Sequence, residues 1–126
     1  MSRHAESTLQ AHCVAWFRLQ YPAKRRLLFA IPNGAFLQGD ARKRAMRAGL
    51  LKKEGMNSGT ADLFLAIQSS DLAGLFIEMK TPKGRQTAEQ AEFERAALEA
   101  GYGYAMPRTL EEFQRVVKLY LTTGKY

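Results

Sequence analysis

Apolar residues recur at helical spacing near the start of the chain. Leu9, Cys13 and Phe17 are four positions apart, and Pro22 follows them. A hydrophobic stripe of this kind, ended by a proline that cannot continue a helix, predicts a helix from about Arg3 to Tyr21. The chain is therefore expected to begin with an amphipathic helix.

The rest of the chain alternates between short apolar runs and longer helical patterns. Short runs bounded by Gly, Pro, Asn or Ser predict strands, and periods of three and four residues predict helices. In order, the expected elements are a strand Leu27–Ile31, a short helix Asp40–Ala48, strands Ala61–Ile67 and Leu75–Lys80, a helix opened by Thr87 and ending at Gly101, a strand Gly103–Met106, and a helix from Thr109 to about Leu121 with Glu112 completing a capping box. This order predicts one α/β domain over residues 1–126.

The run Leu75–Lys80 carries two charges on one face of an apolar strand. Side chains alternate along a strand, so Glu78 and Lys80 point the same way, roughly 7 Å apart at about 3.3 Å rise per residue. The opposite face holds only Leu, Ile and Met. A buried acid and base are costly unless they have partners or a ligand. We therefore expect the chemistry of the chain at this pair.

Asp62 is a third charge that converges on the same place. It lies at the start of the strand Ala61–Ile67, whereas Glu78 lies near the end of the next strand. If the two strands form an antiparallel hairpin, these ends meet, and Asp62 comes close to Glu78 and Lys80. The alternative is a turn residue after Gly59 that hydrogen-bonds its own backbone.

Two further polar residues have both a functional and a structural interpretation. Glu6 shares one helical face with the apolar residues of its helix, but a first-turn glutamate is also favoured by the helix dipole alone. Gln90 completes a capping box with Thr87, in which its side chain returns a hydrogen bond to the backbone of the threonine. A role in a site would require Gln90 to face the strand instead.

The excess of basic residues indicates which class of partner the chain binds. The 126 residues include 19 Lys and Arg against 12 Asp and Glu, a formal net charge of +7, which favours nucleic acid ahead of a membrane surface.

No apolar run is long enough to span a membrane, and the N-terminus lacks the apolar segment of a secretory signal. Cys13 is the only cysteine, so neither an intrachain disulfide nor a cysteine zinc site is expected. These features suit a reducing cytoplasm, either bacterial or that of a phage-infected host, or another reducing compartment with access to DNA.

The cluster of Asp62, Glu78 and Lys80, with Glu6 as a candidate fourth member, favours a hard divalent cation. Mg²⁺ takes oxygen ligands and often needs only one or two carboxylates. A lysine beside them can orient water or offset charge on an attacked phosphate. In a basic chain, this set suggests metal-assisted hydrolysis of a phosphodiester, and the lack of a His and Cys cluster argues against zinc.

These residues resemble the PD-(D/E)xK nuclease superfamily. The wider pattern is similar to its virus-type replication-repair nuclease (VRR-NUC) branch, over roughly Glu6 to Val117. The segments that carry the resemblance are the helix with Glu6, Pro32-Asn33-Gly34, Gly59-Thr60-Ala61-Asp62-Leu63, Ile77-Glu78-Met79-Lys80 and Gln86 to Gln90. Ala61 stands where the family has a proline that shapes the turn. The resemblance implies a restriction-endonuclease-like core, with a small mixed sheet of about four strands flanked by helices.

The resemblance also implies a catalytic set consisting of Glu6, Asp62, Glu78, Lys80 and Gln90. Asp62 and Glu78 would bind Mg²⁺ or Mn²⁺, with the backbone carbonyl of Met79 as a further ligand. Lys80 would position or activate the attacking water. Glu6 would border the metal and could add to its ligands.

Basic residues lie in sequence on both sides of the ExK strand. They could neutralise DNA phosphates without reading bases, although a solvated basic surface explains any one of them. The candidate DNA contacts are Asn33, Gly34, Arg42, Lys43, Arg44, Arg47, Lys52, Lys53, Lys83 and Arg85.

The resemblance to this branch implies a metal-dependent, structure-selective DNA endonuclease that could resolve four-way (Holliday) junctions in DNA repair. Symmetric cutting of a junction needs two active sites, hence a homodimer, whose contacts could come from Phe36-Leu37 or from the final helix. The alternatives are a sequence-specific or end-dependent nuclease of the same superfamily, and a DNA-binding module that kept the fold and lost catalysis.

Overall fold

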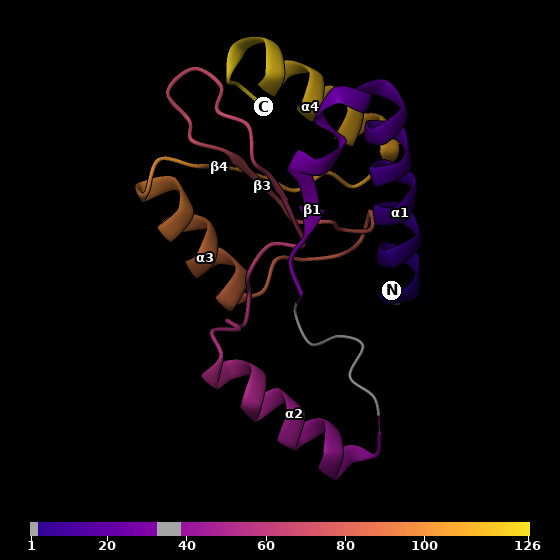
Figure 1. The fold of residues 1–126 in the computed structure, drawn as a ribbon, viewed down its shortest axis with the longest axis vertical. Coiled ribbons are helices and arrows are strands. Elements are labelled where there is room, and N and C mark those ends of the chain that lie inside the picture. Colours follow the sequence, from indigo (N-terminus) through magenta and orange to yellow (C-terminus); the bar gives the residue numbers. More distant parts are fainter. Residues whose placement is uncertain (1–2, 33–38) are drawn as a thin grey trace.

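The computed structural model describes residues 3–32 and 39–126 of the chain (Figure 1). Asn33, Gly34, Phe36 and Leu37 lie outside these ranges. The elements, in order, are α1 (Arg3–Gln20), the 3₁₀ helix η1 (Pro22–Leu27), β1 (Leu28–Ala30), α2 (Ala41–Lys53), β2 (Leu63–Leu65), β3 (Leu75–Ile77), α3 (Ala88–Glu99), β4 (Gly103–Ala105) and α4 (Leu110–Thr123).

The four strands form one mixed sheet in the order β1-β2-β3-β4. The pairs β1–β2 and β2–β3 are antiparallel, and the pair β3–β4 is parallel. A parallel pair needs a crossover connection, and α3 supplies it between β3 and β4. The expectation of a small mixed sheet flanked by helices is confirmed.

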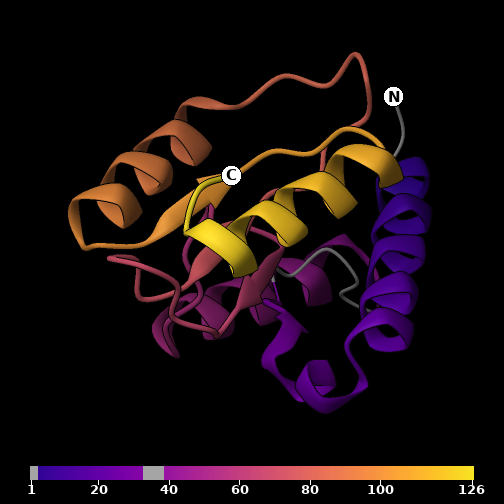
Figure 2. The same cartoon turned by 90° about the horizontal axis from the view of Figure 1, so that it is seen from above.

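The helices cover the two faces of the sheet differently (Figures 1 and 2). Alternate strand residues such as Leu63 and Ile77 are fully buried in one core with side chains of α1 and α4, among them Phe17 and Phe113. The other face carries aromatic rings, and α3 reaches it through Phe93. Polar strand residues on this second face are therefore directed towards α3.

The strands are shorter than the sequence predicts, and at one end of the β2–β3 pair a side chain replaces the backbone ladder. In the register of β2 and β3, Leu63 pairs with Ile77. Beyond that pair, the backbone N–H of Met79 donates to the Asp62 carboxylate at 2.8 Å, not to a strand carbonyl. Towards β4, the pairing continues past the assigned strand, since the Glu78 N–H donates to the Ala105 carbonyl at 2.8 Å.

Two helices also differ from expectation. α2 continues to Lys53, beyond the predicted end at Ala48, because Gly49 inside a helix costs only about 1 kcal/mol. The apolar spacing of the helix opened by Thr87 predicts burial of both Ala97 and Leu98; in α3, Ala97 is buried but Leu98 is 45% exposed.

The last helix begins as the sequence predicts, but its cap is built differently. Thr109 accepts a hydrogen bond from the Glu112 N–H at 3.1 Å. The Glu112 carboxylate accepts from the N–H of Arg108, one residue before the capping threonine, at 2.9 Å. Within residues 3–32 and 39–126, no helix has the length and apolar character needed to cross a membrane.

Candidate active site

Asp62 and Glu78 face each other just beyond the paired part of β2 and β3. The register that pairs Leu63 with Ile77 places the residue before Leu63 across from the residue after Ile77. The hairpin expected from the sequence is therefore present. Asp62 is held in place because its Oδ2 accepts the Met79 N–H at 2.8 Å. A carboxylate that bonds backbone in this way does not serve as a simple turn residue.

Glu78 is the most deeply buried acid of the site, with a relative exposure of 3%. Its Oε2 accepts a hydrogen bond from Gln90 Nε2 at 2.8 Å. The same oxygen is 3.9 Å from the Lys80 ammonium, which is also buried. Its other oxygen, Oε1, is buried and accepts no hydrogen bond from a protein donor among the described residues, and the carboxyl group interacts with that of Asp62 through a side-chain hydrogen bond. An oxygen in this state is costly unless a cation or water reaches it.

Gln90 fulfils both interpretations of its position because it uses two different atoms. Its Oε1 accepts the Thr87 N–H at 2.9 Å, and its own N–H donates to Thr87 Oγ1 at 3.1 Å, which completes the capping box. Its Nε2 is left to donate to Glu78. The cap therefore fixes the amide that orients the Glu78 carboxylate.

The two carboxyl groups have perturbed acidities. Burial, the neighbouring Asp62 and the more distant Glu6 raise the pKa of Glu78 to about 8, against the opposing effect of the Lys80 ammonium. Burial also raises the pKa of Asp62, although its bond to the Met79 N–H opposes the shift. Two acids that resist ionisation side by side form the kind of pair that a divalent cation stabilises.

Glu6 acts on this pair through its charge. It is half-buried in the first turn of α1, and its carboxylate raises the pKa of Glu78. Within the described residues, no three His, Cys, Asp or Glu side chains are grouped closely enough to hold a metal by themselves. Any metal here would rely on two carboxylates and on other oxygens.

The donor set fits a hard cation. Asp62 and Glu78 offer carboxylate oxygens, one of them without a protein donor among the described residues, and Mg²⁺ commonly uses one or two carboxylates together with water and phosphate oxygens. The lysine within 4 Å of Glu78 keeps the cluster from being purely anionic. A cation held by such a set could assist attack on a phosphate.

The expected basic residues that the structure describes are all exposed. Lys83 and Arg85 lie in the loop that follows Lys80. The other six belong to α2, which lies apart from the sheet, past the end at which β1 stops (Figure 1). The Asp62 carbonyl bonds the N–H of Ile31 just after β1, so α2 and the carboxylates occupy the same end of the sheet.

Arg108 is a residue that the sequence analysis missed. Its Nη1 donates to the carbonyls of Thr81 at 2.8 Å, Pro82 at 3.2 Å and Gly84 at 2.7 Å. It thereby holds the loop that follows Lys80. Its position follows from the parallel pairing of β3 and β4. Parallel strands end at the same edge of a sheet, so Arg108, which follows β4, lies near the loop that follows β3 and Lys80.

Comparisons with known proteins bear on this fold. No protein-family model matches the chain, and no curated protein matches its sequence. A solved structure described as a VRR_NUC domain protein superposes with a TM-score of 0.78, over 95% of this chain and 90% of its own, at 20% sequence identity. The chain therefore has the fold of a VRR_NUC domain protein, in agreement with the family that its sequence resembles.

Proposed function

We propose that the chain is a Mg²⁺- or Mn²⁺-dependent endonuclease that hydrolyses phosphodiester bonds in branched DNA, including four-way junctions. The observation that carries the proposal is the group formed by buried Glu78 and Lys80 with half-buried Asp62 and Gln90 at one end of the β2–β3 hairpin. A pair of carboxyl groups with raised pKa values is an expensive arrangement, and such pairs concentrate at functional sites.

Asp62 and Glu78 would hold the metal, with the Met79 carbonyl as a third oxygen and Glu6 at the border of the site. Oε1 of Glu78 supports this assignment, because a buried carboxylate oxygen without a donor is suited to a cation. When bound, the cation would polarise the phosphate and lower the pKa of the attacking water.

The other residues of the site position these groups. The Met79 N–H fixes Asp62, and the Gln90 amide fixes Glu78. The Lys80 ammonium would orient the attacking water and stabilise the charge that develops on the phosphate. Arg108 would hold the loop after Lys80 in place through its hydrogen bonds to the loop carbonyls. The loop in this position would present Lys83 to the DNA backbone.

DNA is the substrate that the surface charge favours. The net charge of +7 and the exposed basic residues of α2 suit contacts with phosphates, which bind any sequence. In the described ranges we find no recognition helix or finger of the kind that reads bases, so selectivity would come from DNA shape. Such a substrate would place the protein in a compartment that contains DNA, such as a bacterial or phage-infected cytoplasm or another reducing compartment with access to DNA.

A symmetric cut in a four-way junction would require a homodimer. Apolar side chains available for this contact include Leu119 of the final helix, 41% exposed, and Met46 and Leu50 of α2, 65% and 56% exposed. Light scattering of the free chain would report the oligomeric state, and a monomer at every concentration would contradict the dimer.

The proposal is tested by cleavage of three labelled DNAs of equal length: linear duplex, flap and four-way junction. With Mg²⁺ or Mn²⁺, the branched DNAs should be cut internally and faster than the duplex. Cleavage of linear duplex at one sequence, or only from ends, would favour the alternative nucleases. DNA binding without cleavage of any substrate would favour the non-catalytic module.

A further inference from the structure

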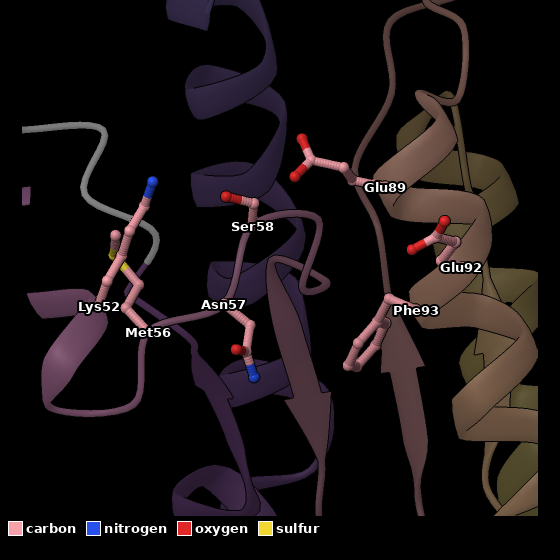
Figure 3. Close-up of a pocket in the computed structure, with 7 residues that line it drawn as sticks. All are labelled: Lys52, Met56, Asn57, Ser58, Glu89, Glu92 and Phe93. Carbon is pink, nitrogen blue, oxygen red and sulfur yellow. The ribbon is translucent and has the colours of Figure 1, made fainter. Parts of the chain in front are cut away.

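A pocket of about 550 Å³ lies between the C-terminal end of α2 and the first turns of α3 (Figure 3). One wall is the segment after α2, and the other is the face of α3 that precedes and follows Gln90. Its lining includes Lys52, Asn57, Ser58, Glu89, Glu92 and Phe93.

Both walls of the pocket run directly into the catalytic group. Ser58 lies four residues before Asp62, and Glu89 immediately precedes Gln90. The two walls approach each other closely at Gly59, whose φ is +84° and where an added Cβ would lie 2.5 Å from the Glu89 backbone carbonyl group. Because Gln90 donates a hydrogen bond to Glu78, the α3 wall lies next to the proposed metal site.

The lining has an aromatic ring and several hydrogen-bonding groups. Figure 3 shows the Phe93 ring pointing from α3 towards the segment with Asn57, and the Glu89 carboxylate extending towards Ser58. Phe93 also packs edge-on against Phe76, with ring centroids 4.9 Å apart. This contact with the sheet supports the orientation of the Phe93 ring.

These groups suit an uncharged ring with N–H donors better than a phosphate. Glu89 and Glu92 repel phosphate oxygens, but carboxylates accept hydrogen bonds from the amino group of cytosine. The amide of Asn57 can both accept from and donate to a base edge, as in contacts with adenine. Aromatic side chains stack on any base.

We propose that this pocket takes one unpaired nucleobase next to the scissile phosphate, stacked on Phe93 and hydrogen-bonded by Asn57 and the α3 carboxylates. Lys52, at the α2 side, contacts a flanking phosphate. The inference rests on the proposed nuclease function and gives its substrate class a physical basis. A base in a single-stranded flap is already unpaired, so it enters at little cost, whereas a base in duplex, including the paired arms of a four-way junction, must first be extruded.

The test is a binding experiment that needs no cleavage. Wild-type protein with a chelator is titrated into flap DNA that carries the fluorescent base 2-aminopurine in the single-stranded flap, at the nucleotide next to the branch point. Stacking on Phe93 should lower the fluorescence at least twofold, and 2-aminopurine in the middle of a paired arm should change far less. Phe93→Leu and Asn57→Ala should each remove half or more of the quenching, while the Kd for the DNA stays within about threefold.

Two features keep the outcomes separate. Asn57 is exposed, so its variant tests the pocket even if Phe93→Leu disturbs packing against Phe76. The matched control is Glu99→Gln, an exposed change at the end of α3, which should leave the fluorescence quenching as in the wild type. Equal quenching in wild type and both pocket variants, or none in wild type, would overturn the pocket while leaving the nuclease proposal intact. A wild type that cuts no DNA with metal present would refute the nuclease proposal instead.

Discussion

Replacing Glu78 by Gln should stabilise the metal-free chain, and the gain should grow with pH. In the folded chain the pKa of Glu78 is raised to about 8, whereas its ordinary value is 4.5. Between these values the unfolded chain has lost a proton that the folded chain keeps. The free energy of unfolding of the wild type therefore falls as pH rises through this window. A glutamine does not titrate and can still accept the Gln90 hydrogen bond.

The magnitude follows from the distance between the two pKa values. Each pKa unit corresponds to about 1.4 kcal/mol, so the rise from 4.5 to about 8 is worth at most about 5 kcal/mol above pH 8. None of this difference remains below about pH 4, where both states hold the proton. The advantage of Glu78→Gln should thus increase by roughly 1 kcal/mol per pH unit between pH 5 and 8.

Urea denaturation with a chelator present, from pH 4 to 9, measures this difference directly. Glu99→Gln, an exposed change in α3, controls for the general effect of removing a carboxylate. Saturating Mn²⁺ should shrink the advantage of the variant, because a metal that binds the ionised carboxylates stabilises only the wild type. A difference between variant and wild type that stays constant from pH 5 to 9 would refute the reasoning.

Three further predictions concern the residues around this pair. Gln90→Glu keeps the capping oxygen but removes the N–H that donates to Glu78. The rate of single-turnover cleavage should therefore fall tenfold or more, while the helical circular dichroism stays unchanged. An unchanged cleavage rate would exclude a positioning role for Gln90. Arg108→Met loses three bonds to loop carbonyls and should lower the free energy of unfolding by about 2 kcal/mol, unlike the exposed control Arg115→Met; equal stability would contradict the role of that guanidinium. Lys83→Ala should reduce the salt dependence of DNA binding, log Kd against log salt, by about 0.9; an unchanged slope would remove Lys83 from the interface.

Much of the site was predictable because it depends on short-range patterns. The alternation along Leu75–Lys80 and a hairpin with the preceding strand sufficed to bring Asp62 to Glu78, and the register of β2 and β3 confirms this hairpin. The α/β order and the capping of α3 by Thr87 follow from local sequence in the same way.

The parts that the sequence did not predict depend on long-range packing or on single atoms. Nothing local specifies that β4 pairs parallel to β3, and Arg108 was overlooked for that reason. The two interpretations of Gln90 were treated as exclusive because residue spacing does not distinguish its oxygen from its nitrogen. The exposure of Leu98 likewise depends on the rotation of α3 against the sheet.

The measurement that tests the central claim most directly is the rate of four-way junction cleavage as a function of Mn²⁺ concentration, for wild type and Glu78→Ala. We predict no cleavage with a chelator, a saturable rise with Mn²⁺ for the wild type, and background rates for the variant, whose DNA affinity should be unchanged because the basic surface is intact. Metal-independent cleavage, or full activity of Glu78→Ala, would contradict the account.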